Sequence, residues 1–333
     1  MSRAKTKTRA GSREDERQAA ALPQSRRPRW QSRERLVGTF MALPSLIPLV
    51  LFALLPVAYV VFLSFTRYNG VTSPQWIGLD NYQLMFKDQS WWQAVLITLV
   101  FAVGQIVIGI PLSLLLATVL NSGIRGMGLF RGLFFLPYVI SIAIIGIVFY
   151  FLLRPDNGVI NGILQALNLI STDVDWLGSQ GTALGSLILV GVWSNFGINM
   201  VFFLVALQTV PKELLESAQL DGANAIQRFR HVSLPLLAPI TRVVVVLSIV
   251  FSLRSFDLVK TLTDGGPAGQ TDVMYTYLFD YFFGTDRGSQ YGYASALAVV
   301  ASIIAAIVSL GYMAVSRDRA ARDKTAIAKK GKR

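Results

Sequence analysis

Apolar residues run in six long segments, and short polar stretches separate one segment from the next. The segments cover residues 36–65, 94–120, 133–153, 182–208, 236–253 and 292–315. About 20 helical residues cross the hydrocarbon core of a bilayer, so each segment can form a span. A helix satisfies its own backbone hydrogen bonds at that depth, whereas an open strand does not. The pattern therefore predicts an all-α, polytopic membrane protein with six transmembrane helices.

The first, second and fourth segments are longer than a straight span needs. Helices of this kind tilt or kink, and sharp kinks occur mainly at proline. The expected kink points are Pro44, Pro48, Pro56 and Pro111.

Composition supports a membrane protein and excludes several kinds of chemistry. Of 333 residues, 53% are hydrophobic and only 15% are charged, whereas about a quarter of a soluble domain is charged. The absence of cysteine excludes a disulfide framework, a thiolate zinc site and a cysteine nucleophile. A single histidine argues against a histidine-based metal site.

The positive charges indicate how the chain crosses the membrane. The formal net charge is +12, and Lys and Arg concentrate before the first span, between the second and third, between the fourth and fifth, and after the sixth. Basic residues favour the cytoplasmic side, so both termini are expected there. Residues 1–35 are expected to form a disordered basic cytoplasmic tail, residues 36–315 the permease domain, and residues 316–333 a second basic cytoplasmic tail. Because the tails hold almost no aromatic residues for base stacking, the lipid bilayer and not nucleic acid is their expected partner.

The spans contain no ionisable residue in their central parts. Intramembrane charges usually mark proton relays, ion sites and voltage sensors, so their absence argues against an ion-coupled carrier and an intramembrane hydrolase. No G-x-x-x-x-G-K-[ST] phosphate loop occurs in the chain. The sequence thus predicts a non-enzymatic membrane protein that binds no cofactor and is driven by another protein.

Uncharged polar residues do occur in the spans. The most unusual group is Trp193-Ser194-Asn195 in the fourth. An indole can cover the C–H face of a sugar while an amide and a hydroxyl exchange hydrogen bonds with its OH groups. Helix–helix hydrogen bonding is the simpler interpretation of any one of these residues.

The polar segment 209–235 separates the fourth and fifth spans. Thr209 is expected to cap a helix whose first turn contains Pro211 and Glu213, and Gly222 permits a tight left-handed turn. A second short helix is expected at residues 223–231, ended by Leu234-Pro235. This predicts a cytoplasmic helix–turn–helix that either lies on the lipid or fits a groove on a partner protein.

The same segment resembles the EAA motif (E-A-A-x3-G-x9-I-x-L-P) of ABC importer permeases. The matching residues are Glu216-Ser-Ala218, Gly222 and Val232-Ser-Leu-Pro235, with Ser217 and Val232 replacing the usual alanine and isoleucine. Asp221, Ala223 and Phe229 also agree with the form found in carbohydrate-uptake permeases.

Other stretches extend the resemblance along most of the chain. They are Trp76-Ile-Gly-Leu-Asp-Asn-Tyr82, Leu136-Pro-Tyr138, Gly158-Val-Ile-Asn161 and Leu262-Thr-Asp-Gly-Gly-Pro267. The last is typical of the first of two paired sugar permeases, similar to the maltose and glycerol-3-phosphate membrane subunits.

The resemblance implies a type I, maltose-transporter-like permease in a bacterial cytoplasmic membrane. The expected partners are a second permease with its own EAA motif, two cytoplasmic ATPases that bind ATP and Mg, and an external solute-binding protein. The residues expected to contact an ATPase are Leu214, Leu215, Glu216, Ser217, Ala218, Asp221, Gly222, Ala223, Ile226, Phe229, Val232, Leu234 and Pro235.

The resemblance also implies that sugar contacts come from the fourth and fifth spans. Ser248 matches a serine of the maltose-type subunit, whereas Ser252, Asn195 and Ile198 stand where that subunit has asparagine, glycine and tyrosine. The expected substrate pathway is Trp193, Ser194, Asn195, Ile198, Ser248, Phe251 and Ser252.

A sugar is the expected substrate, and glycerol-3-phosphate or another polyol is the alternative. More distant alternatives are a secondary carrier and a membrane-embedded transferase that would use Asp257, Asp264 and Asp272.

Overall fold

A computed structural model describes residues 41, 44, 46–121, 126–284 and 288–330. The tail predicted at residues 1–35 lies outside the described residues. The chain divides into two compact units, residues 1–59 and 60–333, which are described separately. By length and composition, four described helices can each cross a membrane, and six spans result if each of two bent helix pairs counts as one.

The first helix runs from Leu46 to Leu63 and contains a π-helical turn, η1 (Val50–Leu54), followed by α3 (Leu55–Leu63). The turn ends just before Pro56, and the N–H of Leu55 donates to the carbonyl of Val50. Proline has no N–H to donate four residues back, and a π-helical turn absorbs this defect without ending the helix.

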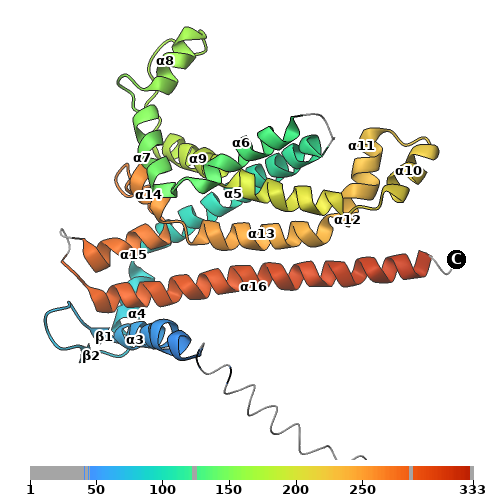
Figure 1. The fold of residues 1–333 in the computed structure, drawn as a ribbon. Helices are drawn as coiled ribbons and strands as arrows, with labels where there is room; N and C mark the ends of the chain where they lie inside the picture. Colours follow the sequence, from blue (N-terminus) through green and yellow to red (C-terminus); the bar gives the residue numbers. More distant parts are fainter. Residues whose placement is uncertain (1–40, 42–43, 45, 122–125, 285–287, 331–333) are drawn as a thin grey trace, which may run out of the picture. The chain divides into compact units, whose positions relative to one another are not determined.

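Four long helices organise the second unit (Figure 1): α5 (Gln89–Leu120), α9 (Gln180–Gln208), α13 (Ala238–Leu253) and α16 (Tyr291–Lys330). α5 packs along α9 on one side and against α13 on the other, and α13 in turn contacts α16. α5 continues through Pro111, an expected kink point, as one 32-residue helix. α16 extends the sixth predicted span to Lys330, well past its expected end at residue 315.

The third predicted span is not one straight helix. α6 (Met127–Val139) and α7 (Ile142–Leu152) meet at 93°, because Ile140 and Ser141 are extended. α6 crosses α9, whereas α7 packs against α14 (Asp257–Leu262), where Gly146 makes room for Thr261.

The fifth span is also bent, and the expected helix end at Leu234-Pro235 is wrong. α11 (Ala225–Arg228), η2 (Phe229–Ser233) and α12 (Leu234–Leu236) form one helical rod that bends by 68° into α13. The π-helical η2 lies directly before Pro235, just as η1 lies before Pro56, and Leu234 N donates to Phe229 O. The π-helical turn accommodates Pro235 without ending the helix, and the 68° bend into α13 lies at Leu237.

Short elements connect the helices, and several motif residues hold these connections in place. A two-residue hairpin, β1 (Thr66–Arg67) with β2 (Gln75–Trp76), precedes α4 (Asp80–Lys87). Asn81 Nδ2 donates to the carbonyls of Ser64 and Thr66, both at 2.9 Å. Asn161 of α8 (Val159–Ala166) receives the indole N–H of Trp176 at 2.8 Å.

Asp88 joins three helices at one end of the bundle. One carboxylate oxygen caps α5 by accepting from the backbone N–H groups of Ser90 and Trp91. The other accepts the hydroxyls of Tyr277, from α15 (Met274–Phe283), and Tyr293, from α16, both at 2.7 Å. A carboxylate that accepts four N–H and O–H groups fixes the relative positions of these elements.

Glycines allow the closest helix crossings. A Cβ at Gly197 in α9 would collide with the backbone carbonyl of Phe134 in α6, and a Cβ at Gly191 would collide with the Gln105 side chain of α5. The backbone is the less adaptable neighbour, so Gly197 is the stricter requirement.

We expect Gly197→Ala to destabilise the bundle by about 1–3 kcal/mol, because the added methyl group forces α6 away from α9. Gly185→Ala is the matched control, since it lies in the same helix with open space where its Cβ would be. It should gain roughly 0.5–1 kcal/mol from helix propensity. Melting temperatures of the detergent-solubilised variants measure both effects, and a Gly197→Ala protein as stable as Gly185→Ala would contradict the crossing.

Candidate functional site

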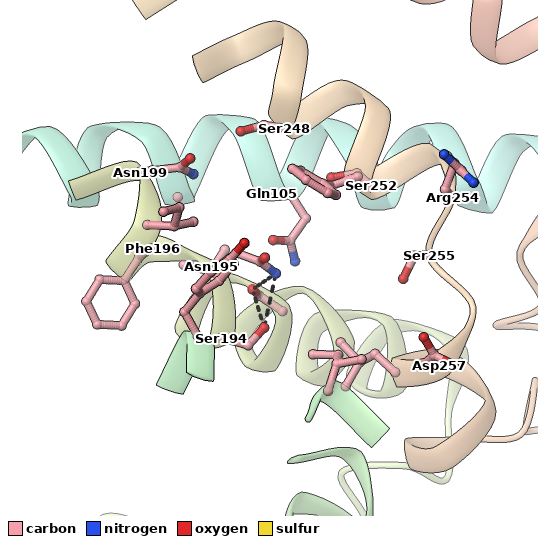
Figure 2. A pocket seen from close by; sticks show the side chains of 18 of the residues that line it. Gln105, Ser194, Asn195, Phe196, Asn199, Ser248, Ser252, Arg254, Ser255 and Asp257 are labelled. Atoms are coloured by element: carbon pink, nitrogen blue, oxygen red, sulfur yellow. Dashed lines mark hydrogen bonds between the residues drawn. The ribbon is translucent and has the colours of Figure 1, made fainter. Parts of the chain in front are cut away.

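A cavity of about 540 Å³ lies where α5, α9, α13, α14 and the α6–α7 connection meet. Ligand pockets typically enclose about 300–1,000 Å³, so its size suits a small solute. Amides, hydroxyls and aromatic rings line it (Figure 2). The lining residues are Phe101, Gln105, Gly109, Pro137, Tyr138, Ile140, Ile142, Gly191, Val192, Ser194, Asn195, Phe196, Ile198, Asn199, Ser248, Val250, Phe251, Ser252, Arg254, Ser255, Phe256, Asp257 and Leu258.

The α9 wall carries a hydrogen-bonded pair. Ser194 Oγ donates to the carbonyl of Gly191 at 2.9 Å, and Asn195 Nδ2 donates to the same carbonyl at 3.0 Å and to Ser194 Oγ at 3.1 Å. These bonds fix the Asn195 amide on its own helix (Figure 2). Its Oδ1 accepts no hydrogen bond from the described residues.

The α5 wall contributes Gln105, which points from α5 toward Ser194 and Asn195 in Figure 2. Gln105 Nε2 donates to the carbonyl of Ile188 in α9 at 2.9 Å. Farther along α5, the hydroxyl of Ser113 donates to its own helix at Gly109 and across to Phe196 O at 3.0 Å. Two polar side chains therefore connect α5 to α9 along the cavity.

The wall formed by α13 and the turn after it is different, because its serine hydroxyls are not used by the described structure. Ser248, Ser252 and Ser255 line the cavity, and their side chains make no hydrogen bond to any described residue. A helical serine usually donates to a carbonyl of the preceding turn, as Ser113 does. Three hydroxyls without a protein partner beside a cavity are available to a solute.

The cavity gathers six of the seven predicted pathway residues: Ser194, Asn195, Ile198, Ser248, Phe251 and Ser252. Trp193 is not among the lining residues. Its ring packs edge-on against Phe149 of α7, with 5.3 Å between ring centroids. Adjacent residues on a helix are about 100° apart, so Trp193 cannot share the direction of both Ser194 and Asn195.

Two ionisable residues reach the cavity, although the central parts of the spans hold none. Arg254 and Asp257 both line it, at the end of α13 remote from α12. The sequence pattern places both residues just beyond the fifth apolar segment and suggests a solvated connection. The turn from α13 into α14 instead carries them back toward the cavity, which hydropathy alone does not reveal.

The segment between α9 and α13 forms an elbow, defined here as residues 212–236. Thr209 does not cap α10 (Lys212–Leu220) as expected. Its hydroxyl donates to Ala206 O at 2.8 Å and closes α9, so Pro211 is the residue that precedes α10. A threonine hydroxyl competes in this way for a carbonyl of the preceding turn.

Two reciprocal hydrogen-bond motifs shape the turn of the elbow. Gly222, at φ +83°, donates to Gln219 O, and Ala223 N donates to Ala218 O, both at 3.0 Å. This is a Schellman motif with glycine in the left-handed position. Asn224 and Gln227 then form a capping box at the start of α11.

The elbow has an inner and an outer surface. Inside, Arg228 donates to the Gln219 side-chain oxygen, and Leu215, Ala218, Phe229 and Val232 are half-buried. Outside, several apolar side chains are exposed, and the most exposed are Leu214 at 47%, Ile226 at 77% and Leu220 at 90%. Leu220 is absent from the expected docking residues, since the EAA pattern places no requirement on it. Glu216 and Asp221 are exposed and form no ion pair with a described residue.

Residues 109–321 match the family described as "Binding-protein-dependent transport system inner membrane component". The chain belongs to this family of transport permeases. It is 33% identical, over 84% of its length and 89% of the relative's, to the probable ABC transporter permease protein YesP of Bacillus subtilis (strain 168). It is 32% identical to the multiple sugar-binding transport system permease protein MsmF of Streptococcus mutans, over 84% of this chain and 94% of MsmF.

Comparison with solved structures agrees with this family assignment. The chain matches a bacterial ABC transporter involved in the import of the acidic polysaccharide alginate, with a TM-score of 0.74 and 25% identity over 87% of this chain and 98% of that chain. The expected resemblance to carbohydrate ABC importer permeases, and the all-α membrane fold, are thereby confirmed.

The three carboxylates considered for a transferase have separate environments in the permease. Asp264 forms an ion pair with Lys260 at 2.6 Å, and Asp272 accepts the hydroxyl of Thr276 at 3.0 Å. Of the three, only Asp257 lines the cavity. The family is one of transport subunits, and no enzyme family is indicated.

The loop that follows α14 carries a carboxyl group with a raised pKa. Burial raises the pKa of Asp272 from an ordinary value of 3.8 to about 6, against the opposing effect of the Thr276 hydrogen bond. Between these two values the unfolded chain has released its proton while the folded chain retains it. The stabilising contribution of Asp272 is therefore lost as pH rises through this window.

We expect Asp272→Asn to raise the melting temperature at pH 8 by about 2–4 °C, because the amide keeps a hydrogen-bond acceptor without a buried charge. At pH 4 the variant and the parent should differ little. Asp264→Asn is the control in the same loop and should give no gain at pH 8, since it removes the ion pair with Lys260. A variant less stable than the parent at pH 8 would contradict the buried-charge explanation.

Proposed function

We propose that this permease is one membrane subunit of an ATP-driven importer that carries a sugar across a bacterial cytoplasmic membrane. An external solute-binding protein would deliver the sugar. The observation that supports this best is the cavity, where Ser248, Ser252 and Ser255 offer hydroxyls that no described residue uses. Aromatic rings such as Tyr138 and Phe251 lie in the same lining and suit the C–H faces of a sugar.

The elbow is proposed to dock on an ATPase subunit that binds ATP and Mg, with no cofactor held by this chain. Its outer side chains Leu214, Leu220 and Ile226 would enter an apolar groove, and Glu216 and Asp221 would form polar contacts at the rim. The elbow leads through the bend at Leu237 into α13, which carries Ser248 and Ser252. Movement of the elbow would therefore reach the cavity through two helical segments joined at one bend.

The remaining partners and the orientation follow from the same proposal. A second permease with its own EAA motif would complete the pore, this chain being the first of the pair, and both termini would lie in the cytoplasm. Relatives named for sugar transport, such as MsmF and the trehalose/maltose transport system permease protein MalF of Thermococcus litoralis, support a carbohydrate. MalF is 29% identical over 86% of this chain and 96% of the relative.

A phosphorylated polyol such as glycerol-3-phosphate is the second candidate substrate. The specific observation in its favour is Arg254, a cation in the cavity lining that could bind a phosphate.

The direct test reconstitutes this chain with its second permease, ATPase and binding protein in liposomes. We expect sugar uptake that requires enclosed ATP and the binding protein, and none from liposomes that hold this chain alone. Uptake against a gradient by the chain alone would identify a secondary carrier and contradict the proposal.

The role of the elbow is tested at Gly222. A β-branched residue is rare at φ +83°, and the left-handed conformation costs a residue other than glycine about 1–2 kcal/mol. Gly222→Val should therefore lower uptake roughly 5- to 30-fold, with insertion into the membrane retained because the position is exposed. Gly222→Asn is the matched control, since asparagine tolerates this conformation. Equal uptake by the two variants would show that the bent elbow is not needed.

A further inference from the structure

We infer that Arg254 and Asp257 together form a subsite for two hydroxyl groups of an uncharged sugar. This inference rests on the proposed transport function and decides between its two candidate substrates. It concerns only the end of the cavity beyond α13, where these two side chains and Ser255 lie (Figure 2).

Arg254 directly follows α13, and its backbone N–H donates to Val250 O at 3.2 Å. Its guanidinium is therefore attached at the carbonyl end of a 16-residue helix, which favours positive charge. The placement stabilises the cation without an acidic partner.

Neither charge is neutralised by the described protein. The ion pairs found among the described residues join Lys260 to Asp264 and to Asp280. Arg254 and Asp257 are both exposed at the cavity, and neither side chain forms a hydrogen bond or an ion pair with a described residue. Two opposite charges thus face the same cavity without forming an ion pair with each other.

Hydrogen-bond donor and acceptor properties determine which kind of solute group can bind both Arg254 and Asp257. A guanidinium only donates and a carboxylate only accepts, whereas a hydroxyl group does both. One hydroxyl of a sugar can accept from Arg254 while another donates to Asp257. A phosphate or carboxylate would satisfy Arg254 but would be repelled by Asp257, and an amine would meet the reverse conflict.

The two charges also cancel across the lining, so this end of the cavity has no net attraction for an ionic solute. Ser255 adds a hydroxyl between them in the sequence, and Phe256 adds an apolar ring to the lining. Mixed donors and acceptors beside an aromatic face suit a neutral sugar ring. The geometry points away from glycerol-3-phosphate and from sugar acids.

The absence of cysteine from the chain permits a sharp test. Ser255→Cys places one thiol beside both charges in the assembled importer in membrane vesicles. Its reaction rates are measured with a neutral, a cationic and an anionic methanethiosulfonate reagent, each normalised to a free thiol. The measurement is repeated with Arg254→Gln, with Asp257→Asn, and with the control Asp156→Asn, an exposed carboxylate outside the cavity lining.

In the importer that carries Ser255→Cys alone, called the parent here, both charges are present and balance. We expect the anionic and cationic reagents to react with its thiol at rates within about threefold of each other. Asp257→Asn should raise the anionic-to-cationic ratio about tenfold and Arg254→Gln should lower it by a similar factor, while Asp156→Asn leaves it unchanged.

Protection of the same thiol tests sugar recognition. The probes are maltose, cellobiose and lactose, each compared with its aldonic acid, maltobionate, cellobionate or lactobionate. At least one neutral disaccharide should slow the reaction in the parent more than its acid does. Asp257→Asn should remove that preference.

Three results would overturn the inference: better protection by the acids in the parent, no protection by any probe, or a thiol that no reagent reaches because a partner subunit covers it. ATP-driven sugar uptake measured with the parent importer separates these failures from failure of the proposed function. If uptake persists without such protection, the proposed sugar import remains supported and only the proposed Arg254–Asp257 subsite is contradicted.

Discussion

The close approach of α5 and α9 is the constraint on which the bundle and its cavity depend. Gly191 leaves space for the Gln105 side chain, and Gln105 then donates to Ile188 O across the interface. Ser113 makes a second bridge to Phe196 O. Lipid tails are as apolar as the helix surfaces, so such small residues and polar bridges, more than burial, hold membrane helices together. Because α6 and α13 pack against this pair, they depend on its spacing.

The cavity and the elbow use polar groups in opposite ways. In the elbow, Gln219, Asn224, Gln227 and Arg228 satisfy one another, and together with the Schellman turn at Gly222 they fix its shape. At the far end of α13, Ser248, Ser252, Arg254 and Asp257 have no such partners among the described residues. In the proposed function the elbow must keep its shape to transmit movement, whereas the cavity must exchange hydrogen-bond partners with a solute. α13 connects the two across the 68° bend at Leu237.

Much of this arrangement could be predicted from the sequence, where local chemistry determines the outcome. Hydropathy located the helical spans, and Gly222 indicated its left-handed turn. The features that the sequence did not predict correctly arise where tertiary contacts or backbone adjustments compete with local preferences. Leu234-Pro235 suggests a helix end, but η2 accommodates the proline. The bend at residues 140–141 was not among the expected kinks, although Pro137 lies just before it in α6. The position of Arg254 and Asp257 in the cavity lining could not be predicted, because hydropathy gives depth and not the direction in which a turn points.

The motifs that reveal the family mainly hold loops and not solute. Asn81 fixes the turn before α4, Asn161 fixes the segment around α8, and Gly266 O accepts the hydroxyl of Thr271 in the loop after α14. Such residues define a scaffold that relatives named for different substrates can share. Substrate choice must then come from side chains whose polar atoms remain unused by the scaffold. Around the cavity those atoms include Asn195 Oδ1 on α9, the hydroxyls of Ser248 and Ser252 on α13, and the side chains of Arg254 and Asp257 beyond it, where we propose that a guanidinium and a carboxylate bind the same solute.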